Sequence, residues 1–243
     1  MAKVAVVIPS RYGSTRFPGR PLGLIKGKSL IQRVLEQIKQ CKNINLSVVA
    51  TDDQRIYDAV KALGFEVFMT PEECKNGTDR IAFTAEKYLT DCDMFINVQG
   101  DEPLIDPSLV DNLAAELINN KDLEYITAAF PITKQEDIDN PNVVKVVFDQ
   151  NGYALYFSRS AVPYNRDKAE VKYYKHIGIY GYKRDFLINF AKSPSTALEK
   201  AESLEQLRAL ETGKKIKVIL SPADSVGVDS PDDIAKVERK IKI

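Results

Sequence analysis

The sequence predicts an α/β protein whose mostly parallel central sheet has helices on both faces. In residues 4–130, short apolar segments of strand length alternate with segments of helical period. This alternation is typical of a parallel sheet. The pattern changes after Pro131, where two apolar segments flank Asp149-Gln150-Asn151-Gly152, and Asn-Gly between strands favours a hairpin. We therefore expect an antiparallel strand insertion in the second half of the chain.

The first half alternates strand and helix throughout. Strands are expected at residues 4–8, 46–50, 66–69, 94–98 and 125–130. Helices are expected from Ser29 to Cys41, from Asp52 or Asp53 to Leu63, from Thr78 or Asp79 to Leu89, and from Asp106-Pro107 to about Asn119. The first helix has its apolar residues on one side. Gly64 ends the second helix, and Pro107 suits a first helical position after an Asp cap.

The second half mixes hairpin strands with two further helices. Strands are expected at residues 143–148, 153–157, 177–182 and 216–220. One long helix is expected from about Ser195 to Glu211, and a last helix begins at Pro231 after Asp229-Ser230. No linker or repeat divides the chain. We expect a single domain over residues 1–243, with the insertion near 135–182.

Composition excludes several classes of protein. Lys plus Arg equals Asp plus Glu at 34 each, and this balance argues against a nucleic-acid groove. No apolar segment approaches the length of a membrane span, and the first residues form no apolar leader, so we expect no membrane insertion and a cytoplasmic protein. The three cysteines are too widely spaced for a zinc site or a disulfide framework. One histidine cannot build a histidine metal centre.

The segment after the first strand has the composition of an anion-binding loop. Pro9 ends the strand, and the following residues carry Arg11, Arg16 and Arg20 between flexible glycines. Guanidinium groups provide permanent charge and forked donors for phosphate oxygens. A solvated turn with surface arginines is the alternative. The loop matches neither a Walker loop nor the motif G-x-G-x-x-G. Its arginines at the carboxyl end of a first strand indicate a nucleoside triphosphate as the natural ligand.

Two acidic segments predict a magnesium site. Asp101 follows the expected strand 94–98, where open α/β sheets bind ligands. Asp106 is placed to cap the next helix, which leaves Asp101 available for Mg²⁺. Asp229 precedes Ser230-Pro231, so it could either cap the last helix or bind metal. Together, Asp101 and Asp229 would supply the carboxylates that a Mg²⁺-nucleotide needs.

Several other polar residues allow both a functional and a purely structural interpretation. His176 could be catalytic or simply packed. Glu202, Glu205 and Gln206 have helical spacing and would share one face, which could be merely solvated. The same holds for Asp52, Asp53 and Arg55.

Eight ordered segments resemble the 3-deoxy-manno-octulosonate cytidylyltransferases, the CMP-KDO synthetases of lipopolysaccharide biosynthesis. The likeness extends from Val4 almost to the end of the chain. The segments are residues 8–22, 50–53, 76–81, 97–103, 151–159, 175–182, 204–208 and 227–231.

The resemblance implies a Rossmann-like three-layer nucleotidyltransferase fold and a homodimer formed through the insertion. It implies that Asp101 and Asp229 bind Mg²⁺. It places a nucleotide site for CTP at Arg11, Ser14, Arg20, Thr78, Arg80 and Gln99. It places a site for the sugar acid at Gln99, Arg159, His176, Tyr182, Glu205 and Gln206. The family usually has Lys where this chain has Arg20, so charge is kept while its geometry changes.

The reaction that the resemblance implies is attack of the sugar acid's anomeric hydroxyl on the α-phosphorus of CTP. Pyrophosphate leaves, and Arg11 and Arg20 would neutralise its charge as catalytic residues with Asp101 and Asp229. KDO and its 8-amino analogue both remain possible substrates. The alternatives are another nucleotidyltransferase for sialic acid or a sugar 1-phosphate, a nucleotide-binding module without turnover, and a glycosyltransferase using Asp91-Cys92-Asp93.

Overall fold

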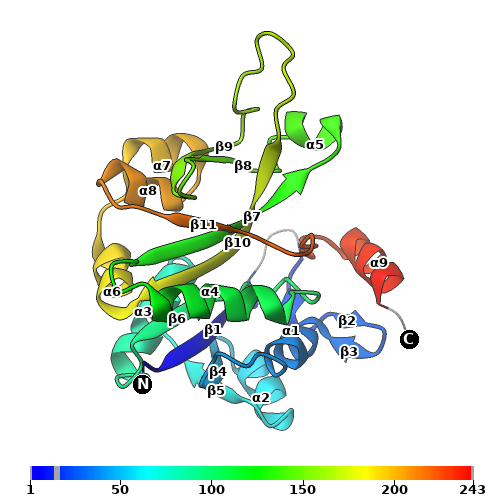
Figure 1. The fold of residues 1–243 in the computed structure, drawn as a ribbon. Coiled ribbons are helices and arrows are strands. Elements are labelled where there is room, and N and C mark those ends of the chain that lie inside the picture. Colours follow the sequence, from blue (N-terminus) through cyan, green and yellow to red (C-terminus); the bar gives the residue numbers. More distant parts are fainter. Residues whose placement is uncertain (1, 14–16, 242–243) are drawn as a thin grey trace.

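One nine-stranded sheet runs through both halves of the chain (Figure 1). The computed structural model describes residues 2–13 and 17–241. Seven strands lie in the order β11-β7-β10-β6-β1-β4-β5. Their bounds are β1 Val4–Ser10, β4 Leu46–Thr51, β5 Glu66–Met69, β6 Met94–Asn97, β7 Tyr125–Ile132, β10 Tyr173–Lys183 and β11 Lys217–Leu220. Only β10 runs antiparallel to its neighbours in this path, β6 and β7.

The expected hairpin is present as β8 (Lys145–Phe148) and β9 (Ala154–Ser158). Gly152 adopts a φ of 76°, the left-handed conformation that the turn requires. β8 also pairs with β10. The strand expected at 177–182 is longer than predicted, because β10 supplies both a partner for this hairpin and a central strand of the main sheet.

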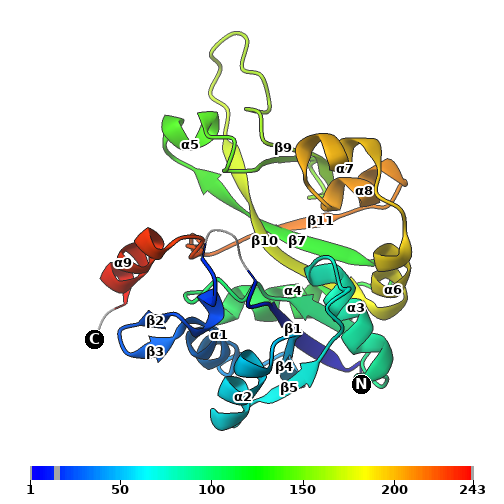
Figure 2. The same cartoon turned by 180° about the vertical axis from the view of Figure 1, so that it is seen from behind.

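Helices cover both faces of the sheet (Figures 1 and 2). One face carries α1 (Leu30–Ile38), α2 (Gln54–Ala62) and α4 (Pro107–Asn119), whose apolar residues share a buried cluster. The other face carries α3 (Gly77–Lys87) and α6 (Arg184–Lys192) with a second cluster. The predicted α/β class with its mostly parallel sheet is confirmed.

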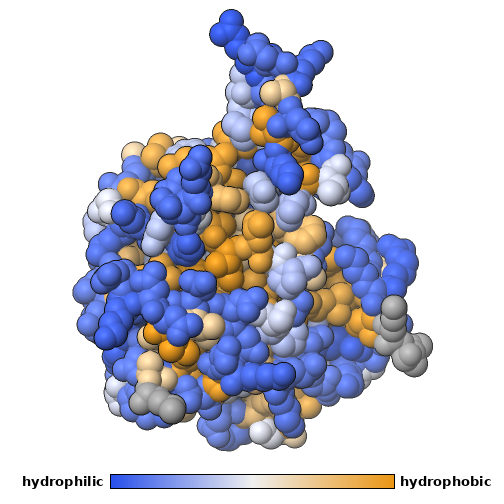
Figure 3. Space-filling model, in the orientation of Figure 1, coloured by the Kyte–Doolittle hydropathy of each residue, from blue (hydrophilic) through white to orange (hydrophobic). Residues whose placement is uncertain are grey.

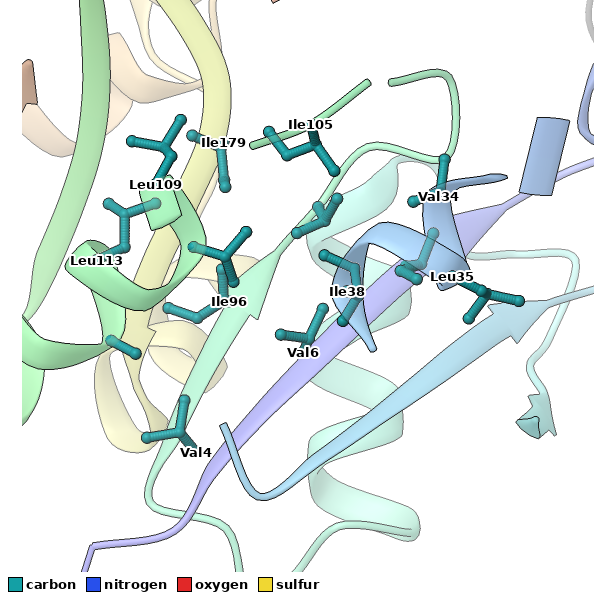
Figure 4. Packing of buried hydrophobic residues seen from close by; sticks show 14 of the residues in the cluster. Val4, Val6, Val34, Leu35, Ile38, Ile96, Ile105, Leu109, Leu113 and Ile179 are labelled. Carbon is teal, nitrogen blue, oxygen red and sulfur yellow. The ribbon is translucent and has the colours of Figure 1, made fainter. Parts of the chain in front are cut away.

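β1 is buried on both faces. Val4, Val6 and Ile8 belong to the cluster beneath α1 and α4, while Ala5 and Val7 belong to the opposite cluster. Figure 4 shows the first cluster, in which β1 and β6 side chains meet those of α1 and α4. A central parallel strand therefore appears in the sequence as a continuous apolar segment.

The prediction of one long helix over residues 195–211 is wrong. This segment forms two helices, α7 (Ala197–Glu202) and α8 (Gln206–Glu211). Ser203 adopts a left-handed φ of 52° at the end of α7, and the chain turns there so that Leu204 is buried. Glu202 consequently does not share a helical face with Glu205 and Gln206.

The sequence analysis did not identify several short elements. They are η1 (Arg20–Leu22), β2 (Leu24–Ile25), β3 (Lys28–Ser29), α5 (Gln135–Asp139) and α6. α6 follows β10 directly and has no capping side chain, so nothing local marks its start. The last helix, α9 (Pro231–Lys240), begins where expected. No helix in the described part of the chain combines the length and apolar character needed to span a bilayer.

Candidate active site

Two pockets adjoin beyond the carboxyl ends of β1 and β6. The loop pocket has a volume of about 420 Å³ and the strand pocket about 430 Å³. The loop pocket is lined by Pro9, Ser10, Arg11, Gly13, Arg20, Pro21, Cys74, Lys75, Asn76, Gly77, Arg80, Gln99, Gly100 and Asp229. The strand pocket is lined by Glu102, Asn142, Val143, Val144, Lys175, His176, Ile177, Gly178, Tyr180, Ser203, Leu204, Glu205, Gln206, Ser225 and Gly227.

The loop pocket is rich in positive charge. Arg11, Arg20, Lys75 and Arg80 line it, and α3 begins at its wall with backbone N–H groups that favour anions. Arg80 is buried, and its guanidinium donates to a carboxylate oxygen of Asp52 over 2.6 Å. The pocket therefore has the electrostatics of a polyphosphate site.

The floor of the loop pocket depends on Gly100. A Cβ at this position would come within 2.8 Å of Ser10 Oγ and 3.3 Å of the Pro9 carbonyl oxygen. The loop after β6 thus lies directly against the end of β1. Ser10 Oγ is buried and finds no hydrogen-bond partner among the described residues, so a bound ligand could satisfy it.

Asp101 and Asp229 meet at Arg20, although they are far apart in sequence. Nη1 of Arg20 lies 2.9 Å from Asp101 Oδ2 and 2.9 Å from Asp229 Oδ1. The same nitrogen donates to the Val228 carbonyl oxygen over 3.2 Å. Both carboxylates also take part in further interactions. Their convergence on one cation shows that this place stabilises positive charge.

Helix capping does not account for this acidic pair. Asp106 caps α4, accepting from the backbone N–H of Ser108 over 2.8 Å. Ser230 and Asp233 form a capping box at the start of α9. Asp101 and Asp229 instead offer oxygen ligands beside a cationic loop, which fits Mg²⁺ bound jointly by protein and phosphate. Within residues 2–13 and 17–241, no three His, Cys, Asp or Glu side chains gather as a metal site of protein ligands alone.

His176 lies in the strand pocket as a neutral imidazole. Burial lowers its pKa from 6.5 to about 3. Its Nε2 lies 2.9 Å from Thr127 Oγ1, and that hydroxyl lies 2.7 Å from the Ile179 carbonyl oxygen. Because the hydroxyl donates its single hydrogen to the carbonyl, it accepts from Nε2–H. Nδ1 is therefore the acceptor atom of the ring.

The opposite wall of the strand pocket is polar and partly unsatisfied. Thr78 Oγ1 donates to Glu205 over 2.5 Å, and Arg208 donates to the same carboxylate over 2.6 Å. Burial nevertheless raises the pKa of Glu205. Gln206 is buried, and its Nε2 has no acceptor in the described part of the chain. A ligand rich in hydroxyl groups would supply one.

Gln99 lies between the two pockets. Its side chain donates to Asn97 Oδ1 over 3.2 Å, and its Cγ would lie 3.9 Å from a Cβ at Gly178. Thr78 is buried at the start of α3 and faces Glu205. Ser14, which the resemblance placed near CTP, lies outside the described residues.

Arg159 and Tyr182 are placed differently from the expectation. The Arg159 guanidinium donates to the carbonyl oxygens of Glu202, over 2.7 Å, and Pro141, over 3.0 Å, so it lies behind the pocket wall. Tyr182 does not line the pocket. It is fully buried in the core and stacked on Tyr125, with ring centroids 4.9 Å apart. The neighbouring Tyr180, on the same side of β10, lines the pocket in its place.

The sequence analysis missed four charged or aromatic residues of the pockets. They are Lys75, Glu102, Lys175 and Tyr180. Burial raises the pKa of Glu102 to about 7, and Ser225 donates to its carboxylate. Lys175 pairs with Asp224. Glu102, Lys175 and Tyr180 stand inside the segments quoted for the resemblance, but only folding shows that they share a cavity.

Asp91 and Asp93 lie away from both pockets. Asp91 pairs with the Lys3 ammonium, and Asp93 accepts from the Lys3 backbone N–H over 2.7 Å. Both acids therefore join the amino ends of β1 and β6, at the opposite edge of the sheet from the pockets. They carry no argument for a glycosyltransferase site.

The sequence is similar to cytidylyltransferases along almost its whole length. A family model described as cytidylyltransferase matches residues 5–216. A 3-deoxy-manno-octulosonate cytidylyltransferase of Desulfatibacillum aliphaticivorans is 47% identical over 243 residues, which are 99% of each chain. An 8-amino-3,8-dideoxy-manno-octulosonate cytidylyltransferase of Shewanella baltica is 46% identical over 242 residues, again 99% of each chain.

Solved structures give the same picture of the fold. A CMP:2-keto-3-deoxy-manno-octonic acid synthetase in complex with CTP superposes with a TM-score of 0.94, at 41% identity over 98% of each chain. A 4-diphosphocytidyl-2C-methyl-D-erythritol synthase of Anaerococcus prevotii has a TM-score of 0.67 at 12% identity, covering 98% of this chain and 96% of its own. The latter likeness concerns the fold alone.

Proposed function

Since the chain belongs to the cytidylyltransferase family, we propose that it joins CTP to 3-deoxy-manno-octulosonate (KDO), giving CMP-KDO and pyrophosphate for lipopolysaccharide biosynthesis. One observation carries the proposal. A cationic pocket and a polar pocket adjoin at the place where Asp101, Asp229 and Arg20 converge. The relatives' names supply the two substrates that these pockets suit.

The loop pocket would hold the nucleotide. Arg11, Arg20, Lys75 and Arg80 balance the triphosphate charge, and the N-terminus of α3 adds its backbone N–H groups. Gly100 allows the loop after β6 to pack against the end of β1, where Ser10 Oγ has no partner among the described residues and would be available to the nucleotide. The Ser14 assignment rests on the resemblance.

Asp101 and Asp229 would hold Mg²⁺ as the required cofactor. When bound, the ion would neutralise phosphate charge and polarise the reacting oxygens. Asp101 lies on the loop after β6 and Asp229 on the loop before α9. Arg20 links the two loops by contacting both carboxylates.

The strand pocket would bind the sugar acid. Nδ1 of His176 can accept a hydrogen bond from a sugar hydroxyl, while Gln206 Nε2 can donate one. Glu205 offers a further acceptor, and Gln99 reaches the junction with the nucleotide. Arg159 would bind or orient the sugar carboxylate. To do so, its guanidinium would give up its hydrogen bonds to the Glu202 and Pro141 carbonyl oxygens and donate to the carboxylate.

In the proposed reaction, the anomeric hydroxyl oxygen attacks the α-phosphorus and pyrophosphate leaves. The two pockets align the reactants, and alignment with charge neutralisation is what phosphoryl transfer chiefly requires. Arg11 and Arg20 would stabilise charge on the departing pyrophosphate.

The 8-amino analogue of KDO is a second candidate substrate. Glu102 and Glu205 both line the strand pocket, and a carboxylate there would favour an ammonium group on the sugar. Lys175, in the same wall, would oppose it. Relatives named for each substrate resemble the chain almost equally.

A homodimer is also part of the proposal. The loop between β9 and β10 projects from the body of the molecule (Figure 1). Apolar residues gather in the middle of the same view, where β7, β10 and β11 cross it (Figure 3). Leu155 of β9 and Leu220 of β11 are 63% and 53% exposed. A second copy could cover them, and light scattering would measure the mass.

A cytoplasmic location would give the enzyme access to CTP.

The proposal is tested by measuring pyrophosphate release from CTP. The second substrates are KDO, 8-amino-KDO, sialic acid and a sugar 1-phosphate, each in a separate assay. We expect turnover with KDO or its 8-amino analogue only. Asp101→Asn should abolish it in a folded protein. Asp58→Asn on the exposed side of α2 is a matched control and should remain active. Near-normal turnover by Asp101→Asn would refute the metal assignment, and CTP binding without any turnover would indicate a nucleotide-binding module.

A further inference from the structure

We propose that Arg20, besides neutralising phosphate charge, couples metal binding to nucleotide binding. Its guanidinium lies between Asp101 and Asp229, and the triphosphate must draw it away before a divalent ion can bind tightly. This inference rests on the proposed nucleotide and metal sites.

The contacts of one nitrogen carry the argument. Nη1 of Arg20 is 2.9 Å from an oxygen of each carboxylate, so these two oxygens are at most twice that distance apart. A cation there offsets the repulsion between the two carboxylates and so allows them to lie close together. The third acceptor, the Val228 carbonyl oxygen, fixes the guanidinium to the loop that carries Asp229.

Arg20 and a divalent ion compete for the same oxygens. A metal ion bound by Asp101 and Asp229 would stand close to the guanidinium, where like charges repel strongly. Arg20 and Asp101 are partly buried, at 24% and 22% exposed, while Asp229 is 56% exposed, so water screens this repulsion more strongly on the Asp229 side. Tight metal binding therefore requires the guanidinium to leave.

The structure provides a destination for Arg20. It also lines the loop pocket, so phosphate oxygens bound there can accept its donors. Its backbone is fixed at the start of η1, where Leu22 N–H donates to the Gly19 carbonyl and Gly23 N–H donates to the Arg20 carbonyl. The movement is therefore one of the side chain. A ligand that removes Arg20 from the acids raises metal affinity, and by linkage the metal raises nucleotide affinity equally.

The test measures Mn²⁺ binding from the electron paramagnetic resonance signal of the free ion, with and without CTP. The proteins are the wild type, Arg20→Ala, Arg20→Gln and Arg20→Lys. Arg239→Ala is the control, because Arg239 is an exposed arginine on α9. Arg20→Gln keeps a long polar side chain without charge, in case the alanine variant folds poorly. Circular dichroism establishes folding.

We expect effects of opposite sign in the two conditions. Without CTP, Arg20→Ala and Arg20→Gln should bind Mn²⁺ about fivefold to tenfold more tightly than the wild type, the gain expected when about two partly exposed ion pairs no longer compete. With CTP, both should bind the Mn²⁺-nucleotide more weakly. Arg20→Lys, which keeps the charge, should remain close to the wild type in both conditions.

Two results separate this inference from the proposed function. Unchanged or weaker Mn²⁺ binding by both uncharged variants without CTP, in folded proteins that still bind CTP, would overturn the coupling role alone. If the wild type bound neither CTP nor Mn²⁺ with CTP, the proposed function itself would fail.

Discussion

Replacing His176 tests the electrostatics of the strand pocket, and no other histidine of the chain complicates the measurement. The chain has one histidine, so a tag-free protein gives one imidazole signal. Burial lowers the pKa of His176 from 6.5 to about 3. We predict that the ring does not titrate between pH 5 and 8, and that Nε2 carries the proton because Thr127 Oγ1 accepts from it.

The lowered pKa has a definite effect on stability. Below pH 6.5 the unfolded chain binds a proton at this residue that the folded chain excludes, so the free energy of unfolding falls as pH falls toward the folded pKa. One proton corresponds to about 1.4 kcal/mol per pH unit. Between pH 8 and pH 5 the loss is therefore about 2 kcal/mol from His176 alone. At pH values more than about one unit above 6.5, the residue causes almost no pH dependence.

Urea unfolding at both pH values measures this loss, and His176→Gln provides the reference. Glutamine can still hydrogen-bond Thr127 but has no titratable group. We expect the wild type to lose about 2 kcal/mol more than His176→Gln on going from pH 8 to pH 5. Nitrogen NMR shifts report the tautomer directly. A ring that titrates near pH 6.5, or equal pH dependence in both proteins, would refute the assignment of a buried neutral imidazole.

Three further changes probe packing and substrate recognition. Gly181→Ala should lower the free energy of unfolding by about 1–3 kcal/mol in urea titrations, because its Cβ would lie 2.7 Å from Ile126 Cγ2 and 2.8 Å from Leu117 Cδ1; an unchanged midpoint would contradict this packing. Arg159→Ala should raise the KM for the sugar acid about tenfold with little change for CTP, and equal losses for both substrates would remove it from the sugar site. Gln206→Met should raise the sugar KM about fivefold in steady-state assays, because the buried amide donor is lost; an unaltered KM would mean that Nε2 does not contact the sugar.

The sequence was most informative where local chemistry determines local structure. The Asp106 cap and the Gly152 turn lie where residue type and position predicted them. Pro9 does not end the first strand as expected, because β1 continues through Pro9, which pairs with Ala50, to Ser10. The approach of Asp101 to Asp229 required more than local information, because their carboxylates lie on loops from opposite halves of the chain. The family resemblance, and not the spacing of the residues, implied that the two acids bind one ion together.

Other features could not be predicted because they depend on packing. Helical spacing over residues 195–211 gave no sign that Ser203 would adopt a left-handed conformation and divide the helix. Tyr180 and Tyr182 lie on the same side of β10 and look equivalent in sequence. Their depth decides their environment, since Tyr182 stacks inside the core while Tyr180 reaches the pocket.

The direction of β10 explains how one edge of the sheet can hold both pockets. Tyr180 pairs with Asn97 at the carboxyl end of β6, so the residues of β10 before Tyr180 extend past that end. An antiparallel strand thus begins where its parallel neighbour stops, and the start of β10 faces the loop that carries Asp101. The register shift between Ile177 and Tyr180 opens β10 for Thr127, whose hydroxyl lies 3.3 Å from the Ile177 carbonyl oxygen and 2.7 Å from that of Ile179. A strictly parallel strand in this position would end at this edge instead of starting there. The polar residues at the start of β10, including His176, would then lie at the far edge of the sheet, away from the acidic pair.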